Sequence, residues 1–379
     1  MKNVTRFMSA MGLAIAAVAA FALPANASAR EFSPFGPRPV VFVQNDSTTG
    51  NQIVAYDRAP NGTLTQAGTY STGGVGGVLA GSVVDHLASQ GSLTYDRRHG
   101  LLYAVNAGSN TVSVFGVIVD RLFLRQILPS GGTFPVSVTV HDDLVYVLNA
   151  RDGGSVQGYR ELFGFVFPIA HSQRSLALPA VATPEFVSTP GQVAFTPDGS
   201  QLVVTTKANG SSVDVFGVRF DGRLSSAPVV NPEPGAVPFA VDFDAAGHLV
   251  VTEAGTNAVA TFSLASNGTI TPIDTKLTGQ AATCWIAQAN GAFYASNAGS
   301  GSLSAFQSSL AGTLTPLGTT STDAGSVDAA TTPDGRFLYV QTGAAGLVDE
   351  FSVNANGSLT PLGSIPVPNG VGGEGIVAL

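Results

Sequence analysis

Side chains able to carry acid–base chemistry are few in this sequence of 379 residues, which has 17 basic residues, 25 acidic residues and 5 histidines. His86 is the strongest candidate for a general acid or base, because Asp85 beside it could orient the imidazole. The pKa of a histidine lies near neutrality and suits proton transfer at physiological pH. A surface or structural role for His86 is the alternative that the sequence leaves open.

Carboxylates form the second set of candidates. Four of them stand at positions expected near the centre of the fold: Asp242, Glu253, Asp328 and Glu374. Asp328 and Glu253 are predicted as the bases that could activate a water molecule. A hydrogen-bonded structural role is the alternative for each.

Four further residues are predicted to contact a ligand: Gln192, Trp285, Arg151 and Lys207. Acyl transfer needs a cation or a hydrogen-bond donor near the developing oxyanion, and Arg151 and Lys207 are candidates for that cation. Trp285, the only tryptophan, could stack on a ligand ring or fill space in the core. The single cysteine, Cys284, is expected to be buried and inert.

The composition excludes several classes of function. A net charge of −8 argues against nucleic acid and against a polybasic membrane-binding surface. One cysteine allows no internal disulfide and no cysteine-based zinc or iron–sulfur site. The sequence contains no phosphate loop, no nucleophile elbow and no known metal-binding motif, so we predict no cofactor and no metal ligands.

The elements that must position these residues come from an internal repeat. Alternating apolar runs joined by a small-residue turn occur seven times, for example LLYAVNAGSNTVSVF at 101–115 and AFYASNAGSGSLSAF at 292–306. The period is about 45 residues, with two longer steps. A short strand precedes each pair of runs, and a glycine turn with a further strand follows, as in NGTLT at 61–65.

Four strands in each of seven repeats predict an all-β fold, a seven-bladed β-propeller with four-stranded blades. A β-solenoid or stacked sandwiches are the alternatives. The first repeat, from Val40, lacks an inner strand, whereas the chain ends on GGEGIVAL at 372–379 with no strands after it. We therefore expect the C-terminal strand to close the ring by completing the first blade, which leaves no long open edge.

The first 29 residues are typical of a signal peptide. Lys2 and Arg6 precede an apolar stretch, and Ala27-Ser28-Ala29 is a small-residue cleavage site. The predicted organisation is a signal peptide at 1–29, a linker at 30–39 and the propeller at 40–379. The mature protein is expected to be secreted or periplasmic and not held in a membrane.

The strings LYAVNAGSNTVSVF, TPDGRFLYV and NGSLTPLG resemble the lactonase-type seven-bladed propellers. That family contains 6-phosphogluconolactonases and carboxymuconate cyclases, and the resemblance covers about residues 40–379. It implies hydrolysis of a lactone ring, or muconate-type cyclisation, on a small molecule at the top of the central channel. A non-catalytic secreted scaffold that binds a ligand or a protein is the second hypothesis, and the sequence leaves any protein partner unidentified.

The sequence departs from the family at the heads of the inner strands, where the family carries His and Arg. Alignment of the repeats places neither a histidine nor an arginine at these positions. They are occupied by Ser92, Val136, Gln192, Ala240, Cys284, Asp328 and Gly375. The resemblance therefore implies the fold and does not carry a catalytic set.

Two insertions interrupt the period, Tyr70 to Gly91 and His171 to Pro190. Both connect one blade to the next and are expected over the top face, where long loops often carry function. His99, His141 and His248 are expected in turns on the opposite face as solvated residues.

Overall fold

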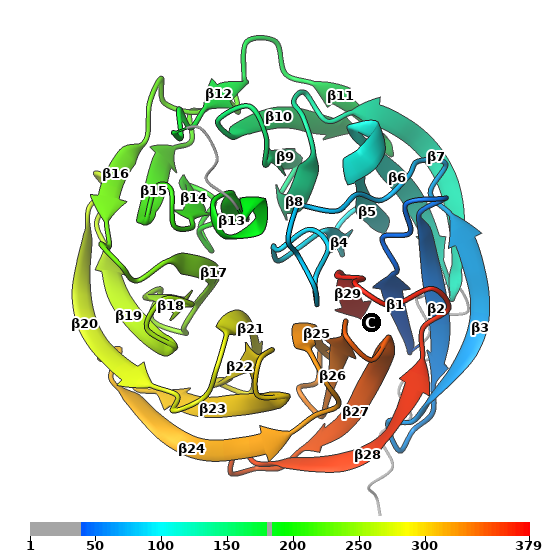
Figure 1. Ribbon diagram of the computed structural model, residues 1–379. Coiled ribbons are helices and arrows are strands. Elements are labelled where there is room, and N and C mark those ends of the chain that lie inside the picture. The colour runs from blue at the N-terminus through cyan, green and yellow to red at the C-terminus, as the bar shows by residue number, and fades with distance from the viewer. Residues whose placement is uncertain (1–38, 180–183) are drawn as a thin grey trace, which may run out of the picture. The chain divides into compact units, whose positions relative to one another are not determined.

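The computed structural model describes residues 39–179 and 184–379. These residues form seven antiparallel sheets around a central axis (Figure 1). Two short 3-10 turns, η1 (Ala107–Ser109) and η2 (Glu185–Val187), are the helical elements of the described ranges. The predicted all-β seven-bladed propeller is confirmed. The predicted signal peptide and residues 30–38 of the predicted linker lie outside the described residues.

Each blade contributes one inner strand to the channel. The inner strands are β29 (Ile376–Ala378), β4 (Leu93–Asp96), β8 (Pro135–His141), β13 (Pro190–Phe195), β17 (Pro238–Phe243), β21 (Thr283–Ala289) and β25 (Ser326–Thr331). The second strands are β1 (Val40–Gln44), β5 (Leu101–Asn106), β9 (Leu144–Asn149), β14 (Gln201–Thr206), β18 (Leu249–Glu253), β22 (Ala292–Asn297) and β26 (Phe337–Thr342).

The third and outer strands complete the blades. The third strands are β2 (Gln52–Arg58), β6 (Thr111–Ile118), β10 (Ser155–Leu162), β15 (Ser212–Gly217), β19 (Ala258–Leu264), β23 (Ser302–Ser308) and β27 (Leu347–Val353). The outer strands are β3 (Leu64–Ser71), β7 (Arg121–Pro129), β11 (Phe165–Pro168), β16 (Val229–Pro232), β20 (Ile270–Leu277), β24 (Leu314–Ser321) and β28 (Leu359–Pro366), and β12 (Arg174–Ser175) also pairs with β10.

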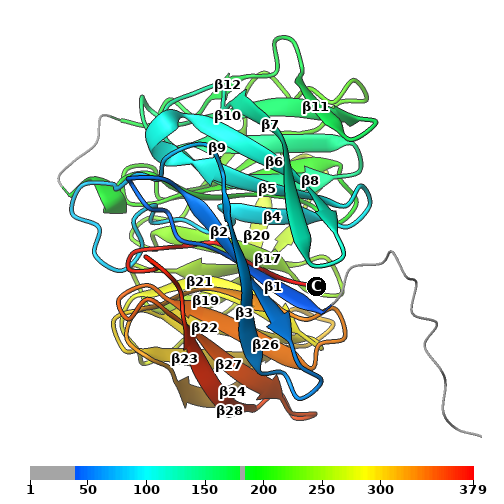
Figure 2. The same ribbon diagram turned by 90° about the vertical axis from the view of Figure 1, so that its right-hand side faces the viewer.

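The C-terminal strand closes the ring, as predicted. β29 pairs with β1 in antiparallel register, with Phe42 opposite Val377. In Figure 2 the C-terminus lies beside β1. The closure makes the first blade from both ends of the propeller sequence, so no inner strand is left without a partner. Within the described residues no helix is long and apolar enough to cross a membrane.

Buried tyrosines connect neighbouring blades. The hydroxyl of Tyr294 donates to the carbonyl of Gly357 at 2.9 Å, and that of Tyr339 donates to the carbonyl of Gly62 at 2.7 Å. Each glycine lies in the turn before an outer strand and has a positive φ, which glycine tolerates at no steric cost. The asparagine–glycine turns therefore bind the preceding blade as well as reversing the chain.

Five inner strands begin with a β-bulge. The register observed after the bulge differs in two blades from the one that the sequence alignment assigned to the channel positions. The observed register puts Ser137 where the alignment placed Val136, and Trp285 where it placed Cys284. A bulge adds one residue to one strand only, so an alignment without it assigns the following side chains to the wrong face.

Candidate functional site

One end of the central channel is covered by the connection between β3 and β4, residues 72–92, which we call the covering segment. Gln90 in this segment exchanges two hydrogen bonds with the backbone of Ile286 in β21, at 2.9 and 2.8 Å. The amide of His86 donates to the carbonyl of Gly372 at 2.8 Å. The segment enters the second blade but bonds to the sixth, so it crosses the axis of the ring (Figure 1).

Two predicted ligand-binding residues hold this segment in place. Trp285 is buried, and its indole nitrogen donates to the carbonyl of Ser89 at 2.6 Å. The ammonium of Lys207 is buried and donates to the carbonyl of Ala88 at 2.5 Å. Burial lowers the pKa of Lys207 to about 7, which the negative charge of Asp85 partly offsets. Neither side chain is accessible to a ligand in this structure.

Arg151 likewise has a structural partner. Its guanidinium binds Glu185 of the second insertion through two contacts of 2.7 and 3.0 Å, and it lies 4.2 Å from the centre of the Phe134 ring. The hydrogen bond from Arg151 holds the pKa of Glu185 below its usual value. Glu185 also accepts from the amide of Ala80, so the two insertions contact each other on one face, as predicted.

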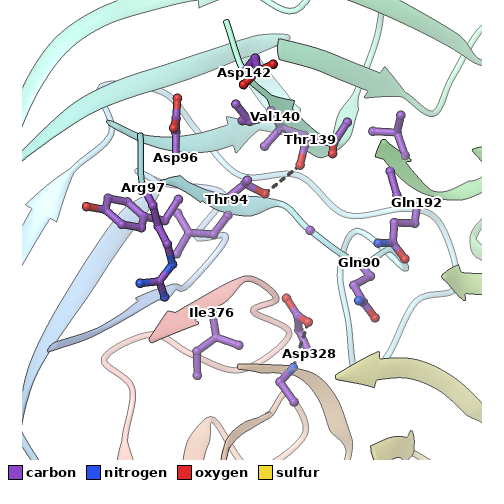
Figure 3. A pocket seen from close by; sticks show the side chains of 17 residues that line it. Gln90, Thr94, Asp96, Arg97, Thr139, Val140, Asp142, Gln192, Asp328 and Ile376 are labelled. Carbon is purple, nitrogen blue, oxygen red and sulfur yellow. Dashed lines mark hydrogen bonds between the residues drawn. The ribbon is translucent and has the colours of Figure 1, made fainter. Parts of the chain in front are cut away.

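The channel is hollow beneath the covering segment, with a cavity of about 470 Å³. Its walls come from β4, β8, β13, β25 and β29, and Asp328, Gln192 and Gln90 lie on its lining (Figure 3). Arg97 and Asp142, in turns at the ends of β4 and β8, are also on the lining and are exposed. The cavity therefore opens on the face opposite to the covering segment. We predicted a site at the top of the channel, whereas this cavity opens at the other end.

Asp328 is the predicted base that faces this cavity. Its side chain is 4% exposed, and its Oδ1 accepts the amide of Ala329 at 2.9 Å. Burial raises the pKa of Asp328 to about 7, although a hydrogen bond from Glu374 and the amides of Ala329 and Ile376 act in the opposite direction. A carboxyl with this pKa is partly ionised at neutral pH and can both accept and return a proton.

Glu374 interacts with Asp328 at the covered end of the cavity. It is fully buried, and its Oε1 accepts the amides of Gly91 at 2.9 Å and Ser92 at 3.3 Å. Burial, followed by the charge of Asp328, raises the pKa of Glu374 well above its usual value. Two interacting buried carboxyls of this kind titrate as a pair, and each disfavours the ionised form of the other.

Two more buried carboxyls surround this pair. The Oδ2 of Asp46 accepts the amide of Glu374 at 2.8 Å, and burial raises the pKa of Asp46 to about 8. Asp85 accepts the amides of Leu87 and Ser89, and burial raises its pKa to about 6. Asp85 thereby fixes the turn of the covering segment above the cavity.

Gln192 supplies a hydrogen-bond donor to the cavity wall. Its Oε1 accepts the amide of Val241 at 2.7 Å, which fixes the orientation of the side-chain amide. Among the described residues no group binds its Nε2. The Nε2 of Gln192 can therefore donate to a ligand in the cavity that also contacts Asp328 (Figure 3).

The structure does not bring His86 and Glu253 to this cavity. His86 is partly buried in the covering segment, and burial lowers its pKa. Glu253 accepts the hydroxyl of Thr256 at 2.9 Å at the end of β18. Cys284 is buried, which raises its pKa to about 12 and agrees with the expected inert thiol.

Arg97, in the turn between β4 and β5, was not among the residues predicted to contact a ligand. The structure places that turn at the mouth of the cavity, with Arg97 on the lining. The length of the two insertions could have indicated this position in the sequence. Because long connections cover one face of the ring, the entrance to the channel is left on the other face.

Comparisons with known proteins support the fold. No protein-family model and no curated protein sequence matches this chain. A putative 6-phosphogluconolactonase from Bacteroides fragilis has a TM-score of 0.69 and 19% identity, over 90% of this chain and 98% of the other. The periplasmic gluconolactonase of Pseudomonas aeruginosa has a TM-score of 0.70 and 18% identity, over 90% of this chain and 99% of the other.

A virginiamycin B lyase from Staphylococcus aureus is also similar, with a TM-score of 0.55 and 15% identity over 77% of this chain and 89% of the other. At these identities the likeness shows a shared fold. The predicted resemblance to lactonase-type seven-bladed propellers is confirmed at this level.

Proposed function

We propose that this protein is a lactone hydrolase that acts on a small molecule in the channel cavity beneath the covering segment. The observation that carries the proposal is the position of Asp328, whose pKa of about 7 suits a general base and whose side chain lines the cavity together with Gln192. The shared fold with a protein named as a gluconolactonase agrees with this reaction class.

The reaction follows from these two side chains. Ionised Asp328 takes a proton from a water molecule, whose oxygen attacks the lactone carbonyl. The Nε2 of Gln192 donates to the resulting oxyanion. Collapse of the tetrahedral intermediate breaks the ring C–O bond, and Asp328 returns its proton to the departing oxygen. The product is a hydroxy acid, and neither side chain is consumed.

The lining favours a small substrate with one negative charge. A cavity of about 470 Å³ lies within the usual range for small-molecule sites. Arg97 at its mouth can pair with one carboxylate or phosphate. Its Nη2 contacts only the carbonyl of Ala378, at 3.5 Å, among the described residues, so most of its donors are available.

The location of this activity is proposed to be extracytoplasmic. The sequence predicts a signal peptide, and the gluconolactonase with the same fold is named as periplasmic. Muconate-type cyclisation is the other reaction that the family resemblance implies, and this cavity would be its site as well. The scaffold hypothesis is favoured by one observation: the covering segment buries Lys207 and Trp285, two of the residues predicted to bind a ligand.

A product analysis tests the proposal. Mature protein is incubated with lactones that differ in ring size and in the presence of a carboxylate or phosphate, and hydroxy acids are detected by NMR. We expect catalytic, saturable ring opening, with preference for a lactone that carries one negative charge. Unchanged spectra across the panel, with protein shown to be folded, would favour the scaffold.

Replacement of Gln192 by Leu tests the oxyanion donor. Loss of one preorganised donor typically lowers kcat by about 10²–10³-fold. We expect Gln192→Leu to lower kcat by about that factor, with a much smaller change in KM, because the donor acts mainly on the transition state. Steady-state kinetics on the best lactone measure both. An unchanged kcat in folded Gln192→Leu would remove Gln192 from the mechanism.

A further inference from the structure

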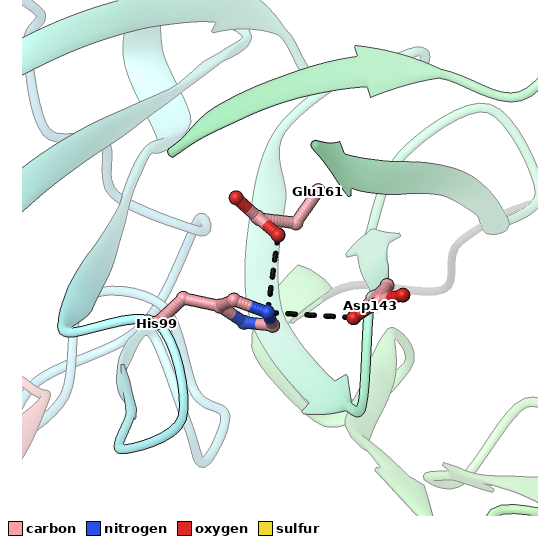
Figure 4. A group of neighbouring side chains, drawn as sticks. All are labelled: His99, Asp143 and Glu161. Carbon is pink, nitrogen blue, oxygen red and sulfur yellow. Dashed lines mark ion pairs between the residues drawn. The ribbon is translucent and has the colours of Figure 1, made fainter. Parts of the chain in front are cut away.

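Three potential metal ligands meet between the second and third blades, on the face where the cavity opens. His99 lies in the turn from β4 to β5, Asp143 directly precedes β9, and Glu161 lies near the end of β10. The Nε2 of His99 lies 3.3 Å from the Oδ1 of Asp143 and 3.1 Å from the Oε2 of Glu161. Figure 4 shows both carboxylates directed at this ring nitrogen.

The two carboxylates are fixed by the sheet. The amide of Glu161 donates to the carbonyl of Asp143 at 2.8 Å, which continues the pairing of β9 with β10. The Oε1 of Glu161 accepts the amide of Gly164, so its Oε2 is the oxygen left to face His99. The side chain of Glu161 is 5% exposed. A nearly buried carboxylate held in this way needs a positive charge opposite it.

Asp96 orients the imidazole from the other side. Its Oδ2 lies 2.6 Å from the Nδ1 of His99, and its Oδ1 accepts the amides of Arg98 and His99. A carboxylate in this place keeps the hydrogen on Nδ1 and leaves the Nε2 lone pair for a ligand. The same arrangement of carboxylate and histidine supports metal-binding histidines in general.

The spacing of the three ligand atoms fits a bound ion. Ligands about 2.0–2.1 Å from a tetrahedral Zn²⁺ lie roughly 3.3 Å apart, close to both contacts of the His99 Nε2. The three ligand atoms lie within 4.8 Å of one another. Neither oxygen meets the geometry of a hydrogen bond with Nε2, although both are within ion-pair distance. One ion bound by all three ligand atoms would satisfy both carboxylates and the Nε2 lone pair at once.

We propose that His99, Asp143 and Glu161 bind a divalent transition-metal ion, with Zn²⁺ as the best match. One imidazole and two carboxylates suit this class of ion. Three protein ligands leave a coordination position open, and it faces a cavity of about 340 Å³ that is also lined by Leu162, Phe163 and Gly164. The sequence predicted no metal ligands and assigned His99 to a solvated turn.

A protonated His99 paired with three carboxylates is the competing arrangement. One Nε2 hydrogen cannot bond well to both Asp143 and Glu161. Arg98 is the other nearby cation, but its Nη1 lies 2.5 Å from Asp142 and its Nη2 3.9 Å from Asp143. The two arrangements predict different results at a pH where histidine is neutral: only the metal site takes up an ion.

Isothermal titration calorimetry with Zn²⁺ tests the site. Untagged full-length mature protein is treated with EDTA, dialysed and titrated with zinc chloride at pH 7.5. We expect one ion per chain with micromolar or tighter affinity, and a rise in the unfolding temperature with zinc, because a ligand that binds only the folded state stabilises it. His99→Gln and Glu161→Gln should each weaken binding by more than about 100-fold, and Asp96→Asn by about 10–100-fold.

His248 provides a matched control. It stands in the corresponding turn of the fifth blade, and its Nδ1 lies 2.8 Å from Asp244, but no carboxylate faces its Nε2 among the described residues. His248→Gln should bind zinc as the wild type does. Absence of saturable binding to the wild type, or binding that His99→Gln and Glu161→Gln leave unchanged, would overturn the proposal. Both variants are checked for folding by circular dichroism, and Asp143→Asn, at a more exposed ligand, repeats the test if either is unstable.

Discussion

Replacement of Asp328 by Asn should lower kcat/KM for lactone hydrolysis by about 10²–10⁴-fold, the usual contribution of a general base. The amide of Asn cannot take a proton from water, whereas its size and its hydrogen bond from the Ala329 amide are kept. The loss should fall on kcat more than on KM, because the base acts on the reacting water and not on substrate binding.

Asp242 gives the matched control for this variant. It lies in the inner strand β17, its Oδ1 accepts the amide of Phe243 at 2.7 Å, and burial raises its pKa to about 6. It is not on the lining of the cavity. Asp242→Asn should retain most of the activity. Equal losses in the two variants would show that a buried charge in the channel affects folding and would remove Asp328 from the mechanism.

The free energy of unfolding should fall as the pH rises from 5 to 7. Burial raises the pKa of Asp46 to about 8, of Asp328 and Asp349 to about 7, and of Asp85 to about 6. The pKa of an aspartate in the unfolded chain is about 4. Between these values the folded state keeps protons that the unfolded state has lost, so raising the pH favours unfolding.

The size of this effect is set by the number of such groups. Each group contributes about 1.4 kcal/mol per pH unit while it is protonated only in the folded state. Full shifts of all four groups would amount to about 9 kcal/mol between pH 5 and pH 7, and we expect urea unfolding at each pH to measure a loss of at least about 3 kcal/mol. Lys207 has the opposite effect on the free energy of unfolding, but only above pH 7, because burial lowers its pKa to about 7. Stability that is constant or rises over this interval would contradict the buried, protonated carboxyls.

The repeat predicted most of the fold. Period-2 alternation and glycine turns depend on local geometry, so seven blades and the closing strand β29 could be recognised without a structure. Asp328 and Gln192 were found because alignment of the repeats places both at the start of an inner strand. The bulges in β8 and β21 could not be predicted, because the extra residue does not change the pattern of apolar residues in the sequence.

The rest of the site depends on contacts between segments far apart in the chain. Glu374 was recognised as a carboxylate near the channel, but its pairing with Asp328 follows from ring closure in three dimensions. The covering segment conceals Trp285 through a contact that spans 196 residues. The neighbours of His99 come from a different blade, so no local motif connects Asp143 and Glu161 with it.

The most direct test of the central claim is the pH dependence of kcat/KM on the best lactone from pH 5 to pH 9, with the uncatalysed rate subtracted. The ionised form of Asp328 is the active base, and its pKa is about 7. We predict that kcat/KM is low at pH 5, rises through a midpoint near pH 7 and reaches a plateau above it. Saturable turnover that does not change with pH over this range, or no turnover on any lactone, would contradict the assignment of the channel cavity as a hydrolytic site.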